Sequence, residues 1–216
     1  MTQTRARSPD DLLAANKIWV AKKLQTEAEF FKRLSLVQQP KILWIGCSDS
    51  RVPANEIVGL QPGEMFVHRN VANVVPHSDM NALAVIQYAV EMLSIEHIIV
   101  TGHYGCAGIR AALSDTDHGQ IDNWLAHIKD VIHAHDEEIS ALKGVQARED
   151  RLCELNVMTQ VRNVAKTSIV QKAWRGGAAL TVHGWIYRLA DGVLHDLDIG
   201  LSATSDLHPA YRIEND

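Results

Sequence analysis

The stretch Lys41-Ile-Leu-Trp-Ile-Gly46 is a compact apolar run of strand length that closes on a glycine. An uninterrupted apolar run of this length is typical of a strand buried on both faces of a sheet. A second such run is His97-Ile-Ile-Val-Thr-Gly102, and apolar residues recur at helical spacing between residues 79 and 93. Because a crossover between parallel strands is usually helical, these runs predict a parallel pair.

The remaining elements extend this sheet. Residues 64–68 and 178–187 predict two more strands, and Asp191-Gly192 is a hairpin signal before an alternating strand over 193–199. Helices are expected over 8–23, 27–36, 106–113, 121–142 and 152–174. The prediction is an α/β fold with a mostly parallel central sheet, four parallel strands and one antiparallel edge strand, flanked by helices. We expect one domain over 1–216, with no internal repeat or linker.

Composition excludes several classes of protein. The 216 residues are 46% hydrophobic and 22% charged, which is an ordinary globular balance. The formal net charge is -5 and basic residues are not clustered, so no nucleic-acid partner is expected. Apolar stretches are too short for a membrane span, and the first residues lack the apolar core of a signal peptide. A cytoplasmic location is therefore predicted.

Three cysteines are too few for a disulfide framework, and two of them follow the strongest strands. Cys47 comes directly after the first run, and His103 and Cys106 follow the second. Ligands of open parallel sheets bind at the carboxyl ends of the strands, so these side chains can converge there. Two thiolates and one imidazole suit Zn²⁺ better than Mg²⁺ or Ca²⁺. Cys153 lies in an apolar helical face and is interpreted as a buried thiol.

The fourth zinc ligand is open at this point. Asp49 could fill the position permanently, as in a closed structural site, or it could pair with Arg51 and leave zinc accessible to water. Cys47 and Cys106 could also be buried structural thiols without a metal. With water at the fourth position, zinc would supply a hydroxide nucleophile, and two anionic thiolates would favour activity at alkaline pH.

The motifs Cys-Ser-Asp-Ser-Arg at 47–51, Phe66-Val-His-Arg-Asn-Val-Ala-Asn73 and Gly102-His-Tyr-Gly-Cys106 together resemble the β-class carbonic anhydrases. The resemblance implies reversible hydration of CO₂ to bicarbonate and a proton on one zinc ion per subunit, in a homodimer or homotetramer. It implies a helical arm over 1–38 that packs on a neighbouring subunit. The roles that it implies are zinc ligation by Cys47, His103 and Cys106, and a gating dyad of Asp49 and Arg51. It also implies a CO₂ pocket of Gln38, Val52, Phe66 and Tyr88, with some of the lining residues supplied by the neighbouring subunit.

The chain further resembles the bicarbonate-regulated bacterial-type subgroup of that family. That likeness implies a noncatalytic bicarbonate site at Trp44, Arg69 and Tyr187, and an inactive state in which Asp49 ligates zinc. For Trp44 and Tyr187 the alternative is a plain role in the core, as is usual for aromatic residues in strands. Two other functions remain open: a zinc hydrolase of a small substrate on the same scaffold, and a noncatalytic zinc-binding or redox-sensing protein.

Overall fold

The structure, a computed structural model, describes residues 7–36 and 38–214 and falls into two compact units, residues 1–38 and residues 39–216. The first unit contains α1 (Pro9–Thr26) and α2 (Phe30–Leu36). Ser8 and Asp11 form a reciprocal capping box at the start of α1, where the sequence predicts the beginning of a helix. No residue of α1 is buried, and five of its apolar side chains are between 42% and 64% exposed: Leu12, Leu13, Ile18, Trp19 and Leu24.

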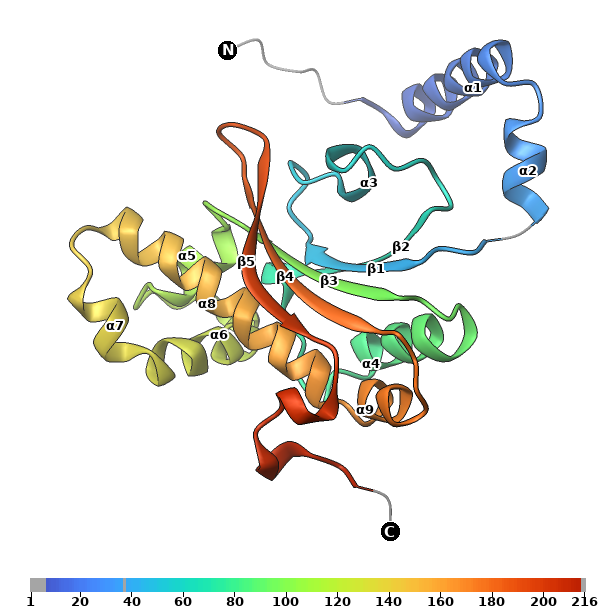
Figure 1. Cartoon of the computed structure of the whole chain (residues 1–216). Helices are drawn as coiled ribbons and strands as arrows, with labels where there is room; N and C mark the ends of the chain where they lie inside the picture. The colour runs from blue at the N-terminus through green and yellow to red at the C-terminus, as the bar shows by residue number, and fades with distance from the viewer. Residues whose placement is uncertain (1–6, 37, 215–216) are drawn as a thin grey trace. The chain divides into compact units, whose positions relative to one another are not determined.

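The second unit is built on a five-stranded sheet in the order β2-β1-β3-β4-β5 (Figure 1). The strands are β1 (Ile42–Cys47), β2 (Met65–Asn70), β3 (His97–His103), β4 (Thr181–Arg188) and β5 (Val193–Leu201). The first four are parallel, and β5 pairs with β4 in the antiparallel direction. The predicted fold class is confirmed.

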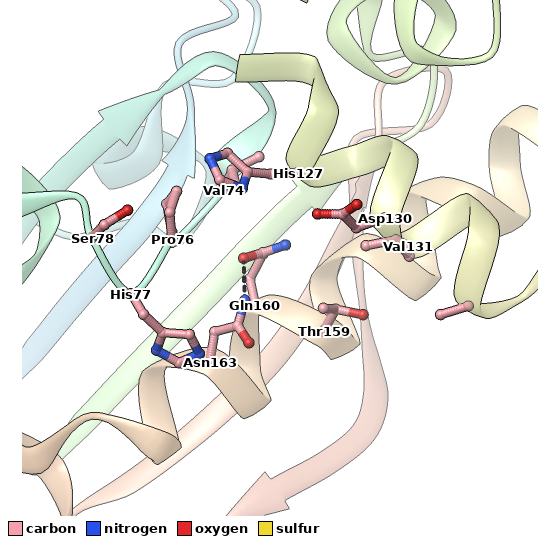
Figure 2. A pocket seen from close by; sticks show the side chains of 11 residues that line it. Val74, Pro76, His77, Ser78, His127, Asp130, Val131, Thr159, Gln160 and Asn163 are labelled. Atoms are coloured by element: carbon pink, nitrogen blue, oxygen red, sulfur yellow. Dashed lines mark hydrogen bonds between the residues drawn. The ribbon is translucent and has the colours of Figure 1, made fainter. Parts of the chain in front are cut away.

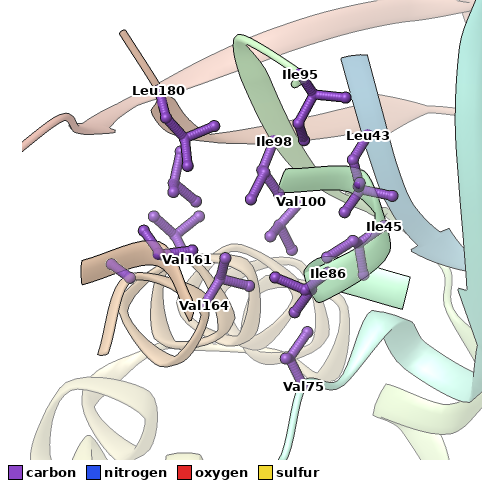
Figure 3. Packing of buried hydrophobic residues seen from close by; sticks show 14 of the residues in the cluster. Leu43, Ile45, Val75, Ile86, Ile95, Ile98, Val100, Val161, Val164 and Leu180 are labelled. Carbon is purple, nitrogen blue, oxygen red and sulfur yellow. The ribbon is translucent and has the colours of Figure 1, made fainter. Parts of the chain in front are cut away.

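One face of the sheet carries the main hydrophobic core. It is covered by α4 (Met80–Gln87), which continues as a π-helix over Tyr88–Met92, and by α8 (Val145–Lys166) and α9 (Ser168–Arg175) (Figure 1). Figure 3 shows Leu43, Ile45, Ile98 and Val100 of the sheet packing against side chains of these helices. On the opposite face, the short helix α3 (Ala54–Ile57) packs near Trp44. The polypeptide after β3 forms α5 (Ala107–Ala112), α6 (Asp122–Ala134) and α7 (Asp136–Ala141).

Two of the predicted helices are interrupted. The helix expected over 121–142 is divided between α6 and α7 at His135, and the one expected over 152–174 is divided between α8 and α9 at Thr167. Thr167 donates its hydroxyl to the Val164 carbonyl at 2.7 Å and accepts from the Val170 amide at 3.3 Å. This side chain therefore ends one helix and caps the next, which apolar periodicity does not reveal.

None of the described helices has the length and apolar character needed to cross a bilayer.

Candidate metal centre

The three predicted zinc ligands meet at the carboxyl edge of the sheet. Cys47 is the last residue of β1, His103 is the last residue of β3, and Cys106 precedes the first residue of α5. Their ligand atoms all lie within 4.8 Å of one another, and the two sulfurs are 3.8 Å apart. All three side chains are buried. Residues 59 positions apart in the chain thus form one compact donor set.

The imidazole of His103 is oriented for a cation. Its Nδ1 lies 3.1 Å from the Tyr104 carbonyl oxygen, which fixes Nδ1 as the donor and leaves a lone pair on Nε2. Nε2 is buried and has no hydrogen-bond partner among the described residues. Two thiols and one free imidazole nitrogen at this spacing fit a zinc ion, since zinc takes Cys sulfur and His nitrogen ligands.

The two sulfurs differ in their surroundings. Cys47 Sγ accepts a hydrogen bond from the Cys106 thiol and one from the Ala72 amide, at 3.8 and 3.4 Å. The bond from Cys106 is the main reason that the pKa of Cys47 lies well below the usual thiol value. The same bond, together with burial, raises the pKa of Cys106. A divalent cation bound to both sulfurs would displace the proton that they share, since zinc is bound by thiolates.

Asp49 and Arg51 form a two-pronged ion pair beside the donor set. Arg51 Nε donates to Oδ1 at 3.0 Å, Nη2 donates to Oδ2 at 2.6 Å, and the Arg51 backbone amide donates to Oδ1 at 2.9 Å. These donors, the guanidinium first, hold the pKa of Asp49 well below its usual range. Asp49 Oδ2 is also 3.6 Å from His103 Nε2. The carboxylate is thus ionised, fixed by Arg51 and adjacent to the place where a cation fits.

Arg69 fixes the loop that carries Asp49. Its Nε donates to the Cys47 carbonyl at 2.8 Å and its Nη2 donates to the Asp49 carbonyl at 2.5 Å. Both bonds come from one planar guanidinium, so Arg69 holds the main chain on both sides of Ser48. The sequence allowed Arg69 a loop-positioning role besides the anion site, but it did not identify these two carbonyl partners.

Trp44, Arg69 and Tyr187 project from the same face of the sheet, because strand register places them on one alternating set of positions. Trp44 is 1% exposed and packs edge-to-face on Trp185, with ring centroids 6.4 Å apart. Its indole lies over Gly46, where an added Cβ would clash with Trp44 Nε1. The core role and the anion-site role of Trp44 are both compatible with this position.

Two of the predicted CO₂-pocket residues, Phe66 and Tyr88, lie away from the donor set along the sheet. Val52, which follows Asp49 by three residues in the chain, is buried. The rings of Phe66 and Tyr88 stack with centroids 5.7 Å apart, but Phe66 is aligned with Leu43, four residues before Cys47. At about 3.3 Å per residue, that places Phe66 about 13 Å along the strand from Cys47. Gln38 is exposed and belongs to the first unit. The pocket assignments stay predictions.

A separate hollow of ≈ 480 Å³ lies between α6, α8 and the segment that follows β2 (Figure 2). Its polar lining includes His77, His127, Asp130, Gln160 and Asn163. Val74 and Pro76 in its wall closely follow Ala72, whose amide donates to Cys47 Sγ. The hollow and the donor set therefore adjoin the same segment of main chain.

A parallel sheet with a buried thiol and imidazole donor set at its carboxyl edge defines an α/β protein with a candidate metal site. The family profile described as "Carbonic anhydrase" matches residues 42–194. The chain is 45% identical over 214 residues to a carbonic anhydrase of Emericella nidulans, covering 99% of this chain and 94% of that protein.

Solved structures agree with this. A tetrameric β-carbonic anhydrase of Sordaria macrospora has a TM-score of 0.85 at 39% identity, covering 88% of this chain and 97% of that one. A Coccomyxa β-carbonic anhydrase in complex with acetazolamide has a TM-score of 0.87 at 35% identity, covering 94% and 91%. The chain therefore belongs to the carbonic anhydrase family, in its β class, and is an enzyme of that family.

Proposed function

We propose that this chain hydrates CO₂ reversibly on a single zinc ion held by Cys47, His103 and Cys106. The observation that carries the assignment is the buried, unpartnered His103 Nε2 beside two sulfurs. Zinc with three protein ligands acidifies a water molecule and thereby supplies a hydroxide nucleophile. The ionised carboxylate of Asp49 accepts the hydrogen bond of the nucleophile and orients it, while Arg51 keeps the carboxylate turned toward that point.

Metal removal tests this proposal. We expect one zinc per chain by elemental analysis, loss of CO₂ hydration after dialysis against a chelator, and recovery on adding one equivalent of zinc. Hydration should rise with pH, because two thiolate ligands disfavour a further anion on the metal. A chelated protein that retains its hydration rate would contradict the zinc assignment.

We further propose that bicarbonate inhibits the enzyme at the face of the sheet that carries Trp44, Arg69 and Tyr187. Two buried polar atoms support an anion site there: Thr101 Oγ1 and Trp185 Nε1 have no hydrogen-bond partner among the described residues. Register places Thr101 and Trp185 in the same row across the sheet as Arg69. An anion that takes the Arg69 guanidinium would release the Asp49 carbonyl, loosen the loop and free the carboxylate to reach zinc.

Arg69→Ala is the variant that tests this regulation. We expect bicarbonate inhibition to weaken by about tenfold, equivalent to about 1.4 kcal/mol of binding free energy, with zinc content unchanged. Inhibition is measured by bicarbonate titration of the initial hydration rate. Arg110→Ala is the matched control, since Arg110 pairs with Glu149 on the outside of α5. Equal inhibition of wild type, Arg69→Ala and Tyr187→Phe would remove the anion-site proposal.

We also propose that residues 1–38 form an arm on a neighbouring subunit of a homodimer or homotetramer. The exposed apolar side chains of α1 support this, because apolar groups gathered on one helix are usually covered. The Sordaria macrospora relative is described as tetrameric. Sedimentation of the full chain should give two or four times the chain mass of 24.0 kDa. A monomer at assay concentration would contradict the arm. A cytoplasmic location stays a prediction.

A further inference from the structure

Helix α8 carries three amide side chains on one face, joined end to end. Asn163 Nδ2 donates to Gln160 Oε1 at 3.1 Å, and Gln160 Nε2 donates to Asn156 Oδ1 at 3.0 Å (Figure 2 shows the first bond). The spacing of four and three residues places the three on one helical stripe. Asn156 and Gln160 are each only 1% exposed. Burying an amide costs free energy unless the amide is hydrogen-bonded, so the other partners of this amide ladder matter.

The amide ladder ends on the strap that follows β2, residues 71–75. Asn156 Nδ2 donates to the Ala72 carbonyl at 2.9 Å, and Gln160 Oε1 accepts from the Val75 amide at 2.8 Å. Within the strap, Ala72 and Asn73 have φ of 62° and 48°. This left-handed conformation is unfavourable for alanine, which has no side-chain group to stabilise it. Two consecutive residues of this kind persist only where the surroundings impose them.

The left-handed conformation of Ala72 affects the candidate metal centre. It turns the Ala72 amide toward Cys47, whose Sγ accepts from it at 3.4 Å. Ala72 is fully buried, and a Cβ built on Gly108 would lie 3.1 Å from Ala72 Cβ. The strap is therefore held between α8 on one side and α5, the helix that follows Cys106, on the other.

We propose that Asn156 and Gln160 are positioning residues of the metal centre, which hold Ala72 in the left-handed conformation that aims its N–H at the Cys47 sulfur. The proposal rests on the proposed zinc ligation by Cys47. An N–H donor stabilises negative charge on the ligand sulfur and fixes the direction of its lone pairs. Asn156 and Gln160 contact neither the ligand atoms nor the place where substrate reacts; they act through the strap.

Asn156→Ala removes the donor to the Ala72 carbonyl. We expect zinc affinity, measured by competition with a chromophoric chelator, to weaken by about tenfold to a hundredfold, the range typical of groups that support a metal ligand. In the Co²⁺-substituted protein, the thiolate-to-metal absorption band should shift. A shift in this band reports on the bonds between the thiolates and the metal, which general destabilisation of the helix would not alter.

Gln171→Ala is the matched control. Gln171 is a fully buried amide on α9 whose bonds go to the Lys166 and Tyr211 carbonyls and to the Ile213 amide, away from the strap. Gln171→Ala should lower the melting temperature and leave zinc affinity within about twofold. A loss of zinc affinity of about tenfold or more is expected only for residues that support the metal ligands.

A second substitution distinguishes positioning from packing. Glycine adopts the left-handed conformation without steric cost, so Ala72→Gly in the Asn156→Ala background should restore most of the zinc affinity. If Asn156→Ala does not fold, Gln160→Met, which is close in shape and removes the acceptor for Val75, takes its place with the same expected direction. A loss of affinity that Ala72→Gly does not restore, or zinc affinity and cobalt spectrum both unchanged, would overturn the positioning role.

Cys47→Ser in the same assay distinguishes failure of the proposed ligand set from failure of the positioning role. Zinc binding that survives Cys47→Ser contradicts the proposed ligand set, and the positioning role falls with it. Zinc binding that is lost in Cys47→Ser but unchanged in Asn156→Ala contradicts the positioning role alone.

Discussion

Cys106→Ser is expected to lower the rate of CO₂ hydration by about a thousandfold or more, because in the proposed reaction the nucleophile comes from a water molecule whose pKa the bound zinc would lower to about 7. Cys106 is 4% exposed and its sulfur lies 3.8 Å from that of Cys47. Serine keeps the size of the side chain but replaces a soft sulfur ligand by a hydroxyl that stays protonated. Stopped-flow hydration with a pH indicator and elemental zinc analysis measure the effect, and both should fall together.

Cys153→Ser is the matched control for this substitution. Cys153 is also a free, buried cysteine, 2% exposed on α8, and burial raises the pKa of its thiol to about 12. Its thiol therefore stays protonated and belongs to the core, so the variant should keep its zinc and most of its hydration rate. A Cys106→Ser protein that still binds one zinc and hydrates CO₂ at the wild-type rate would refute the ligand assignment.

Asp49→Asn is expected to reduce kcat for hydration by about 10²–10⁴, the range of a positioned acid–base group, while zinc content remains unchanged. The variant side chain still offers one oxygen to Arg51 but carries no charge. The hydrogen bond that orients the nucleophile is then lost. Full activity in this variant would show that the carboxylate has no part in the reaction, and loss of zinc would show that it acts as a ligand.

The same substitution has a pH signature in stability. The native pKa of Asp49 is lowered, chiefly by the guanidinium of Arg51, so the ion pair stabilises the fold above the unfolded pKa of about 4 and loses that contribution as pH falls below it. The difference in melting temperature between wild type and Asp49→Asn should be constant from about pH 5 to 8 and shrink in acid. Glu138→Gln, which breaks an exposed pair with Arg151, is the comparison, and its difference in melting temperature should be smaller because an exposed ion pair contributes little.

The parts of the structure that could be predicted from sequence are those that local pattern specifies. Apolar runs indicated the strands, and the direction of parallel strands implied that Cys47 and His103 would meet at one edge. The ends of α6 and α8 were not predictable, because the breaks at His135 and Thr167 lie inside continuous apolar periodicity. The left-handed backbone at Ala72 was also invisible, since alanine gives no sign of that conformation and tertiary contacts impose it.

The contacts between side chains at the site also divide into those that local sequence spacing predicts and those that only the tertiary structure creates. The pairing of Asp49 with Arg51 follows from their spacing of two residues, and the structure contains it. The bonds from Arg69 to the Cys47 and Asp49 carbonyls cross between two strand ends 20 residues or more apart. Backbone carbonyls leave no mark in a sequence motif, so this link could only be seen once the strands were placed side by side.

The two hydrogen bonds from Arg69 to the Cys47 and Asp49 carbonyls have an evolutionary consequence. A single guanidinium supports the main chain of Cys47 and Asp49 and also lies in the proposed anion site, so a mutation of Arg69 that abolishes inhibition also loosens the loop on which turnover depends. Selection for a constitutively active enzyme would then favour changes at the aromatic positions, Trp44 or Tyr187, and retain the arginine. If Arg69 has both proposed roles, regulation and turnover share this residue, and mutation cannot readily separate them.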